Sequence, residues 1–222
     1  MPKYFRQVQD PLSSYTHFLG ACFAVAALAV FVTLGVVLDR PPIVILSSAI
    51  FAASMIALYC ASSYYHTLPS SQPCHTLFRK LDHSMIYVLI AGTYTPICLT
   101  YLPAQRGILF TIAIWGIALA GILVKICWLN APRILYTMLY LLMGWAVVFD
   151  WDGFSAMPSG CLALIAAGGI AYTAGAVIYM LKKPNLSARW GFHELFHIFI
   201  LIGSFFHFLA ILLYIVIGIA VM

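Results

Sequence analysis

The sequence predicts an all-α membrane protein in which seven helices cross the bilayer as one bundle. Hydrophobic residues make up 64% of the 222 residues and charged residues only 8%, whereas a soluble domain carries about 25% charged residues. A soluble chain of this composition would lack the polar surface to cover itself. This excludes an ordinary cytosolic enzyme, a nucleic-acid reader and a disordered segment. The apolar runs are continuous, which favours helices over the alternating strands of a membrane β-barrel.

Seven apolar runs are each close to the ~20 residues needed to cross a hydrocarbon core of ~30 Å. The fifth run is the shortest and the seventh the longest. Prolines end helices, and they stand between the runs at Pro41, Pro42, Pro69, Pro73, Pro103, Pro132, Pro158 and Pro184. The expected spans are Tyr15–Leu38, Ile43–Tyr65, Leu81–Tyr101, Gly107–Leu129, Ile134–Phe149, Gly160–Leu181 and Phe192–Val221.

The connections between these spans are short. The longest expected loop, His66 to Lys80, has 15 residues, which leaves no room for a separate soluble domain. We therefore expect one membrane domain over residues 1–222, with residues 1–14 as an N-terminal tail. The six cysteines form no C-x-x-C pair and are expected to be buried free thiols: Cys22, Cys60, Cys74, Cys98, Cys127 and Cys161.

Orientation follows from the distribution of Lys and Arg, which are enriched in cytoplasmic loops. The net charge of +5 therefore reflects loop asymmetry and indicates no nucleic-acid partner. We expect the N-terminus in the cytoplasm and the C-terminus outside. On the N-terminal side lie nine basic residues, Lys3, Arg6, Arg79, Lys80, Lys125, Arg133, Lys182, Lys183 and Arg189, against Arg40 and Arg106 on the other side.

Polar residues from distant parts of the sequence are predicted to lie at one depth, near the cytoplasmic ends of three spans. Ser62 and His66 end the second span, Asp82 begins the third, and His193 and His197 begin the seventh. Two imidazoles four residues apart share one helix face, as chelation requires. Ionisable residues inside spans are expensive and tend to face the bundle interior. Together these residues indicate a metal site.

The motifs that contain these residues resemble the hemolysin III group of the progestin and adiponectin receptor family, over nearly the whole chain. The start of the first span, Asp10-Pro-Leu-Ser13-Ser-Tyr-Thr16-His17, differs from the family pattern, which often has an acidic pair and an Asn there. The matching stretches are Ser62-Ser-Tyr-Tyr-His66, Lys80-Leu-Asp-His-Ser-Met-Ile-Tyr87, Ala91-Gly-Thr-Tyr-Thr-Pro96, His193-Glu-Leu-Phe-His197 and Gly203-Ser-Phe-Phe-His207-Phe.

The resemblance implies a zinc ion held by His66, His193 and His197, with Asp82 reaching it through a water and Ser62 beside it. Three imidazoles and an open fourth position are typical of catalytic zinc. Asp82 would then act as general base or hold the water in place, and Ser62 would orient a ligand or hydrogen-bond a developing oxyanion. Ser62 alternatively only bonds a backbone carbonyl. The reaction implied is hydrolysis of a lipid amide or ester, similar to a ceramidase, in the lipid or fluidity homeostasis of a bacterial inner or plasma membrane. A membrane lipid is the expected substrate or ligand.

Other interpretations remain open for the same residues. The three imidazoles would hydrogen-bond between helices without a metal, or the zinc would be structural in a receptor-like sensor of membrane state. A pore-forming cytolysin is a third function, which the apolar outer half of the helices disfavours. Asp82 is alternatively a salt-bridge partner of Arg79 or Lys80. We expect His17 and His83 at the headgroup boundary, and His207, with Ser204, as a contact between helices.

Overall fold

The computed structural model describes residues 1–187 and 190–219, and these residues contain helices and no strand. The helices are α1 (Pro11–Val37), α2 (Pro42–Thr67), α3 (His75–Tyr101), α4 (Ala104–Cys127), α5 (Arg133–Gly144), α6 (Trp151–Phe154), α7 (Ser159–Leu181) and α8 (Phe192–Ala210). Short 3₁₀ helices, η1 (Tyr4–Arg6) and η2 (Ala146–Asp150), precede α1 and follow α5, and a π-helical turn, η3 (Ile211–Val216), extends α8.

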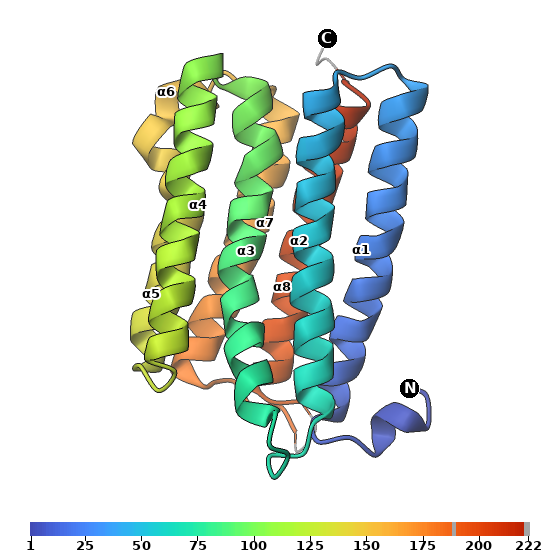
Figure 1. Cartoon of the computed structure of the whole chain (residues 1–222), viewed down its shortest axis with the longest axis vertical. Helices are drawn as coiled ribbons and strands as arrows, with labels where there is room; N and C mark the ends of the chain where they lie inside the picture. The colour runs from blue at the N-terminus through green and yellow to red at the C-terminus, as the bar shows by residue number, and fades with distance from the viewer. Residues whose placement is uncertain (188–189, 220–222) are drawn as a thin grey trace.

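Seven spans in this set are long and apolar enough to cross a membrane, which confirms the predicted fold class. The fifth span combines α5, η2 and α6 as Arg133–Phe154, and the seventh combines α8 and η3 as Phe192–Val216. Figure 1 shows α1 to α4 standing side by side, with α5, α7 and α8 behind them. The N-terminus and the turns α2–α3, α4–α5 and α7–α8 lie at one end, called here the N-terminal end of the bundle.

Several predicted boundaries were wrong. Helix α1 begins at Pro11, so the N-terminal tail is shorter than residues 1–14, because Pro is favoured in the first turn of a helix. Helix α3 begins at His75, which cuts the loop after α2 to residues 68–74. Arg79 and Lys80 lie inside this helix, since Arg and Lys are good helix formers. Arg189 and the end of the seventh span at Val221 lie outside the described residues.

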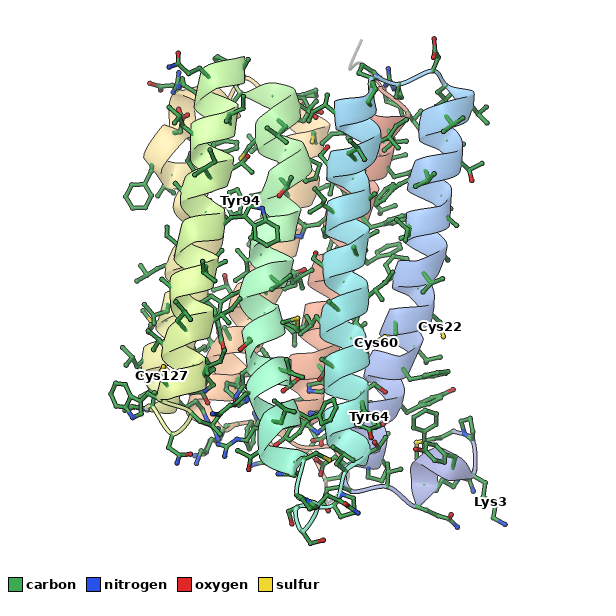
Figure 2. All side chains as sticks on the ribbon, in the orientation of Figure 1. Lys3, Cys22, Cys60, Tyr64, Tyr94 and Cys127 are labelled. Atoms are coloured by element: carbon green, nitrogen blue, oxygen red, sulfur yellow. The ribbon has the colours of Figure 1, made fainter. Side chains whose placement is uncertain are left out.

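The thiols are free, but only Cys98 and Cys161 are buried. Cys22, Cys60 and Cys127 are exposed on the outer faces of α1, α2 and α4, and the three are marked in Figure 2. The prediction of burial was wrong for these three because an apolar span also has a side that faces lipid. A free thiol behaves as a small hydrophobic group and is tolerated there.

Helix α3 is the most enclosed of the spans, and it also supports the break in the fifth span. The hydroxyl of Tyr94 donates to the carbonyl of Gly144 (2.7 Å) and accepts from the backbone N–H of Val147 (3.0 Å). These are the backbone groups that lose helical partners where α5 changes to η2. Irregular backbone at membrane depth persists only where protein satisfies its polar groups, and Tyr94, labelled in Figure 2, does so here.

Small residues bring neighbouring helices into close contact, as is typical of membrane bundles. A Cβ atom on Gly92 of α3 would lie 2.3 Å from Oγ and 2.6 Å from Cβ of Ser54 on α2. Ser54 is itself buried and donates to the carbonyl of Phe51. The contact between α2 and α3 therefore depends on a glycine at position 92.

We predict that Gly92→Ala destabilises the folded bundle, because the new methyl group forces α2 and α3 apart at a cost of about 1–3 kcal/mol. The measurement is the midpoint of thermal aggregation in detergent, followed by size-exclusion chromatography. Gly116→Ala on α4 is the matched control, since a Cβ there meets nothing within 4 Å and alanine favours the helix. Equal midpoints for the two variants would contradict the assignment.

Candidate metal centre

Three imidazoles meet at the N-terminal end of the bundle. His66 lies in the last turn of α2, and His193 and His197 lie one turn apart at the start of α8. One ring nitrogen from each lies within 4.8 Å of the other two. His66 and His197 are buried, at 3% and 2% exposed, and His193 is half-buried. The predicted convergence of the second and seventh spans is therefore present.

The spacing of these nitrogens fits a tetrahedral metal ion. Nε2 of His66 lies 3.3 Å from Nε2 of His193. With metal–nitrogen bonds of about 2.0–2.1 Å, two ligands of a tetrahedral zinc ion stand about 3.3–3.4 Å apart. One ring nitrogen of His197 lies within 4.8 Å of the ligand nitrogens of His66 and His193. The cluster thus offers three ligand atoms suited to a metal ion.

Asp10 orients the first of these imidazoles. Its Oδ2 lies 2.8 Å from Nδ1 of His66. A carboxylate only accepts, so Nδ1 of His66 carries the proton and Nε2 presents its lone pair to the cluster. This is the carboxylate–histidine pairing that fixes the tautomer and the ring plane of metal ligands. The same hydrogen bond holds the pKa of Asp10 below its usual value, so the carboxylate is ionised at neutral pH and loses this interaction only under more acidic conditions.

Backbone and serine contacts hold the start of α1 against the end of α2. The N–H of Asp10 donates to the carbonyl of His66 (3.0 Å). Ser14 Oγ donates to the carbonyl of Ser63, and Ser63 Oγ donates to the carbonyl of Ser14, at 3.0 and 2.9 Å. This reciprocal pair fixes the depth of α1 relative to α2. The carboxylate of Asp10 is thereby brought level with the imidazole of His66.

Glu194, between the two imidazoles of α8, has a structural role. Its Oε2 accepts from the backbone N–H of Gly191 (2.9 Å), and its Oε1 accepts from Ser13 Oγ (3.3 Å). A glutamate in the first turn satisfies amide groups that have no helical partner. Glu194 therefore fixes the start of α8, and the contact with Ser13 joins α8 to α1.

Ser62 and Asp82 line the same cavity as His193 and His197, a space of about 540 Å³. Ser62 is 1% exposed, and its Oγ has no hydrogen-bond partner among the described residues. Asp82 is 8% exposed. Among the described residues its only ion-pair contact is with Nε2 of His83, at 4.0 Å. The alternative of a salt bridge to Arg79 or Lys80 is therefore absent from the described structure.

Beyond the imidazoles the cavity continues between α3, α5, α7 and α8 to the far end of the bundle. Apolar side chains form most of its wall, including Leu89, Ile97, Leu162, Ile165 and Ile200. A long apolar cavity with a few polar groups gathered at one end is the shape expected for a binding site that takes a small amphiphile.

Two other histidines lie inside the bundle, which corrects their predicted place at the headgroup boundary. His17 is 3% exposed, and its ring stacks on His197 with centroids 3.7 Å apart and planes at 15°. His83 lines the cavity, and its ring stacks on Tyr136 with centroids 5.7 Å apart. The error for His17 follows from the wrong start of α1, since a helix that begins at Pro11 carries residue 17 about two turns inward.

The family follows from comparison with known sequences. The profile of the family described as "Haemolysin-III related" matches residues 5–208, a span that contains Asp10, the three imidazoles and His207. The chain belongs to the haemolysin-III-related family. The expected resemblance is thereby confirmed. No solved structure matches the chain at a significant level.

Relatives of this haemolysin III protein cover almost its full length. A "Hemolysin-3 homolog" of Bacillus subtilis is 34% identical over 93% of this chain and 94% of its own. "Hemolysin-3" of Bacillus cereus is 30% identical over 93% and 92%, respectively. An "Adiponectin receptor protein" of Drosophila melanogaster is 27% identical over 92% of this chain and 50% of its own. With the seven apolar spans, these relatives identify a multi-pass protein of the cell membrane.

Sequence reasoning missed Asp10 as the partner of His66 in the imidazole cluster. A usable signal was present, because Asp followed by Pro often marks the start of a helix. Beginning the first span at Pro11 would have placed Asp10 level with His66 at the end of the second span. The stacking of His17 on His197 had no comparable signal, because it depends on how α1 rotates about its axis.

We predict that Asp10→Ala lowers the metal affinity about 10- to 100-fold, because His66 loses the group that fixes its tautomer. Asp10→Asn keeps an amide oxygen as acceptor and is expected to lose less. Affinity is measured by competition with a chelating dye. Asp39→Ala, an exposed aspartate at the opposite end of the bundle, is the control. Unchanged affinity in Asp10→Ala would exclude the orienting role.

We predict that His17→Ala lets the ring of His197 adopt several orientations, because this ring loses the imidazole on which it stacks. The arrangement of the three nitrogens around a bound ion then becomes less uniform. His17→Phe keeps a flat ring at this position and is expected to restore most of the effect. The visible absorption of bound Co²⁺, which depends on ligand geometry, measures the change. If both variants give the wild-type spectrum, His17 does not position His197.

Proposed function

We propose that this haemolysin III protein is a zinc-dependent hydrolase of a membrane lipid amide or ester, acting in membrane lipid homeostasis. The observation that carries the proposal is the cavity. One end is lined by His193, His197, Ser62 and Asp82, and the rest extends between apolar side chains along the bundle. A lipid chain fits such a space while its polar linkage lies beside the imidazoles.

Zinc is the metal that we propose for the cluster. Imidazole ligands also suit copper, iron and nickel. The separation of 3.3 Å between Nε2 of His66 and Nε2 of His193 favours tetrahedral coordination, which zinc adopts most readily. Three protein ligands leave a fourth position for water or substrate. A bound zinc ion would supply Lewis acidity, lowering the pKa of water and polarising a carbonyl group.

The protein groups then divide the remaining work. His66, His193 and His197 bind the metal, and Asp10 keeps Nε2 of His66 unprotonated. The carboxylate of Asp82 accepts a proton from the attacking water and returns it to the leaving amine or alcohol. The hydroxyl of Ser62 donates to the carbonyl oxygen as negative charge develops there. The hydroxyl of Ser62 lies beside the carboxylate of Asp82 and makes no hydrogen bond of normal geometry, so it can turn toward a carbonyl group that binds there.

We predict that Asp82→Asn retains about one zinc per chain but loses at least ~100-fold in lipid turnover, because the general base is removed. His197→Ala is expected to lose both zinc and turnover. Zinc is measured by mass spectrometry on protein purified without chelator, and turnover with amide- and ester-linked fluorogenic lipids in vesicles. Asp39→Asn, far from the cavity, is the control.

The same experiment separates catalysis from a structural role of the metal. If Asp82→Asn keeps zinc and also keeps full turnover, Asp82 is not the base. If the wild-type protein binds zinc but hydrolyses neither type of lipid, the hydrolase proposal fails, and a sensor with a structural zinc becomes the better interpretation.

A further inference from the structure

His207 occupies the same cavity far from the metal cluster. It lies on α8 ten residues beyond His197, which places it about 15 Å further along the helix axis. The side chain is 5% exposed and lines the cavity. A polar group buried at membrane depth is costly unless it is paired. The role of His207 therefore depends on which of its two nitrogens has a partner.

The ring of His207 is held in one orientation. Nδ1 lies 2.8 Å from the carbonyl oxygen of Gly203. Because a carbonyl only accepts, Nδ1 carries the proton and Nε2 is an acceptor. The ring stacks on Tyr172 with centroids 5.2 Å apart and planes at 12°. It also fills the space beside Gly168, where a Cβ atom would lie 2.5 Å from Cε1 and Nδ1 of the ring.

The expected contact between helices is present for both residues: His207 packs on Tyr172 of α7, and Ser204 forms the hydrogen bonds. Tyr59 of α2 donates to Ser204 Oγ (2.6 Å), and the hydroxyl of Tyr172 on α7 lies 2.9 Å from the same oxygen. This set joins α2, α7 and α8 without His207. The hydrogen bond of His207 stays within its own helix, and Nε2 has no hydrogen-bond partner among the described residues.

Other hydroxyl groups on this part of the cavity wall already donate their hydrogen bonds to backbone carbonyls. Thr93 donates to the carbonyl of Leu89, Thr173 to that of Gly169, and Tyr94 to that of Gly144. Nε2 of His207 is therefore an acceptor held open in an otherwise apolar stretch. An acceptor in such a place recognises a molecule that brings one hydrogen-bond donor into an apolar environment.

We propose that His207 binds a hydroxyl group carried within the hydrocarbon chain of the lipid that occupies this cavity. The inference rests on the proposed function to the extent that a lipid chain fills the cavity with its polar end beside the metal cluster. Nε2 accepts the hydrogen bond, and the apolar wall contacts the chain on either side of the hydroxyl. The protein then prefers chain-hydroxylated lipids over plain ones.

The test compares oleic acid with ricinoleic acid, which has the same chain with one added mid-chain hydroxyl. Affinities for the purified protein in nanodiscs are measured by displacement of a fluorescent fatty acid, with no need for metal or turnover. A net hydrogen bond between neutral groups predicts that wild type binds ricinoleic acid about two- to tenfold more tightly. His207→Phe, which keeps a stacking ring but no acceptor, is expected to lose this preference while binding oleic acid as before.

Three further variants locate the effect. His207→Gln places an acceptor near the position of Nε2 and is expected to restore part of the preference. Tyr172→Phe removes the neighbouring hydroxyl and leaves His207 in place, so the preference is expected to persist. Ile165→Val alters the apolar wall and is expected to change both affinities by the same factor.

The outcomes distinguish this inference from the proposed function. Equal binding of the two fatty acids to wild type would overturn the role of His207 alone. So would a preference that survives in His207→Phe or disappears in Tyr172→Phe. If neither fatty acid binds, both proposals are overturned, because no lipid chain would then occupy the cavity. Loss of turnover in Asp82→Asn leaves the fatty-acid preference unchanged, which keeps the two tests independent.

Discussion

The site depends on one constraint: buried imidazoles from α2 and α8 must meet where membrane excludes most water. His66 and His197 are nearly inaccessible, and at this depth unpaired nitrogens are expensive. The surrounding structure serves to keep them together. Asp10 fixes the ring of His66, His17 covers the ring of His197, and Glu194 fixes the start of α8. Helix α1 thus supplies no ligand to the cluster yet orients the ligands of two other helices.

The cavity is polar at one end and apolar along the rest of its length, because different residue types line the two parts. Polar groups gather at the end formed by the last turn of α2 and the first turns of α3 and α8. Further along, hydroxyl groups such as those of Thr93 and Thr173 donate to backbone carbonyls of their own helices. They offer no hydrogen to the cavity, so the wall behaves as apolar there. This arrangement suits an amphiphile with one polar end, and His207 is the point at which the apolar stretch is interrupted.

The fold class and the meeting of His66, His193 and His197 could be predicted, because hydropathy fixes the spans and the ends of spans fix depth. Two properties could not be predicted: the rotation of each helix about its axis and the residue at which each helix begins. His17 and His83 were placed at the boundary because sequence gives depth to within a turn but not the direction of a side chain. Asp10 was missed because α1 begins four residues earlier than expected, and Tyr94 because its partners arise only where α5 breaks.

The cluster of three imidazoles draws its nitrogens from the second and the seventh spans. During synthesis α1 and α2 enter the bilayer before α8 has been made. At that stage His66 and Asp10 are in place, but the cluster still lacks His193 and His197. Only a chain whose seventh span has inserted in the correct direction brings His193 and His197 to the same end. Occupancy by an ion would therefore mark a molecule in which α8 has inserted, and chains that lack α8 or carry it inverted would remain without the ion.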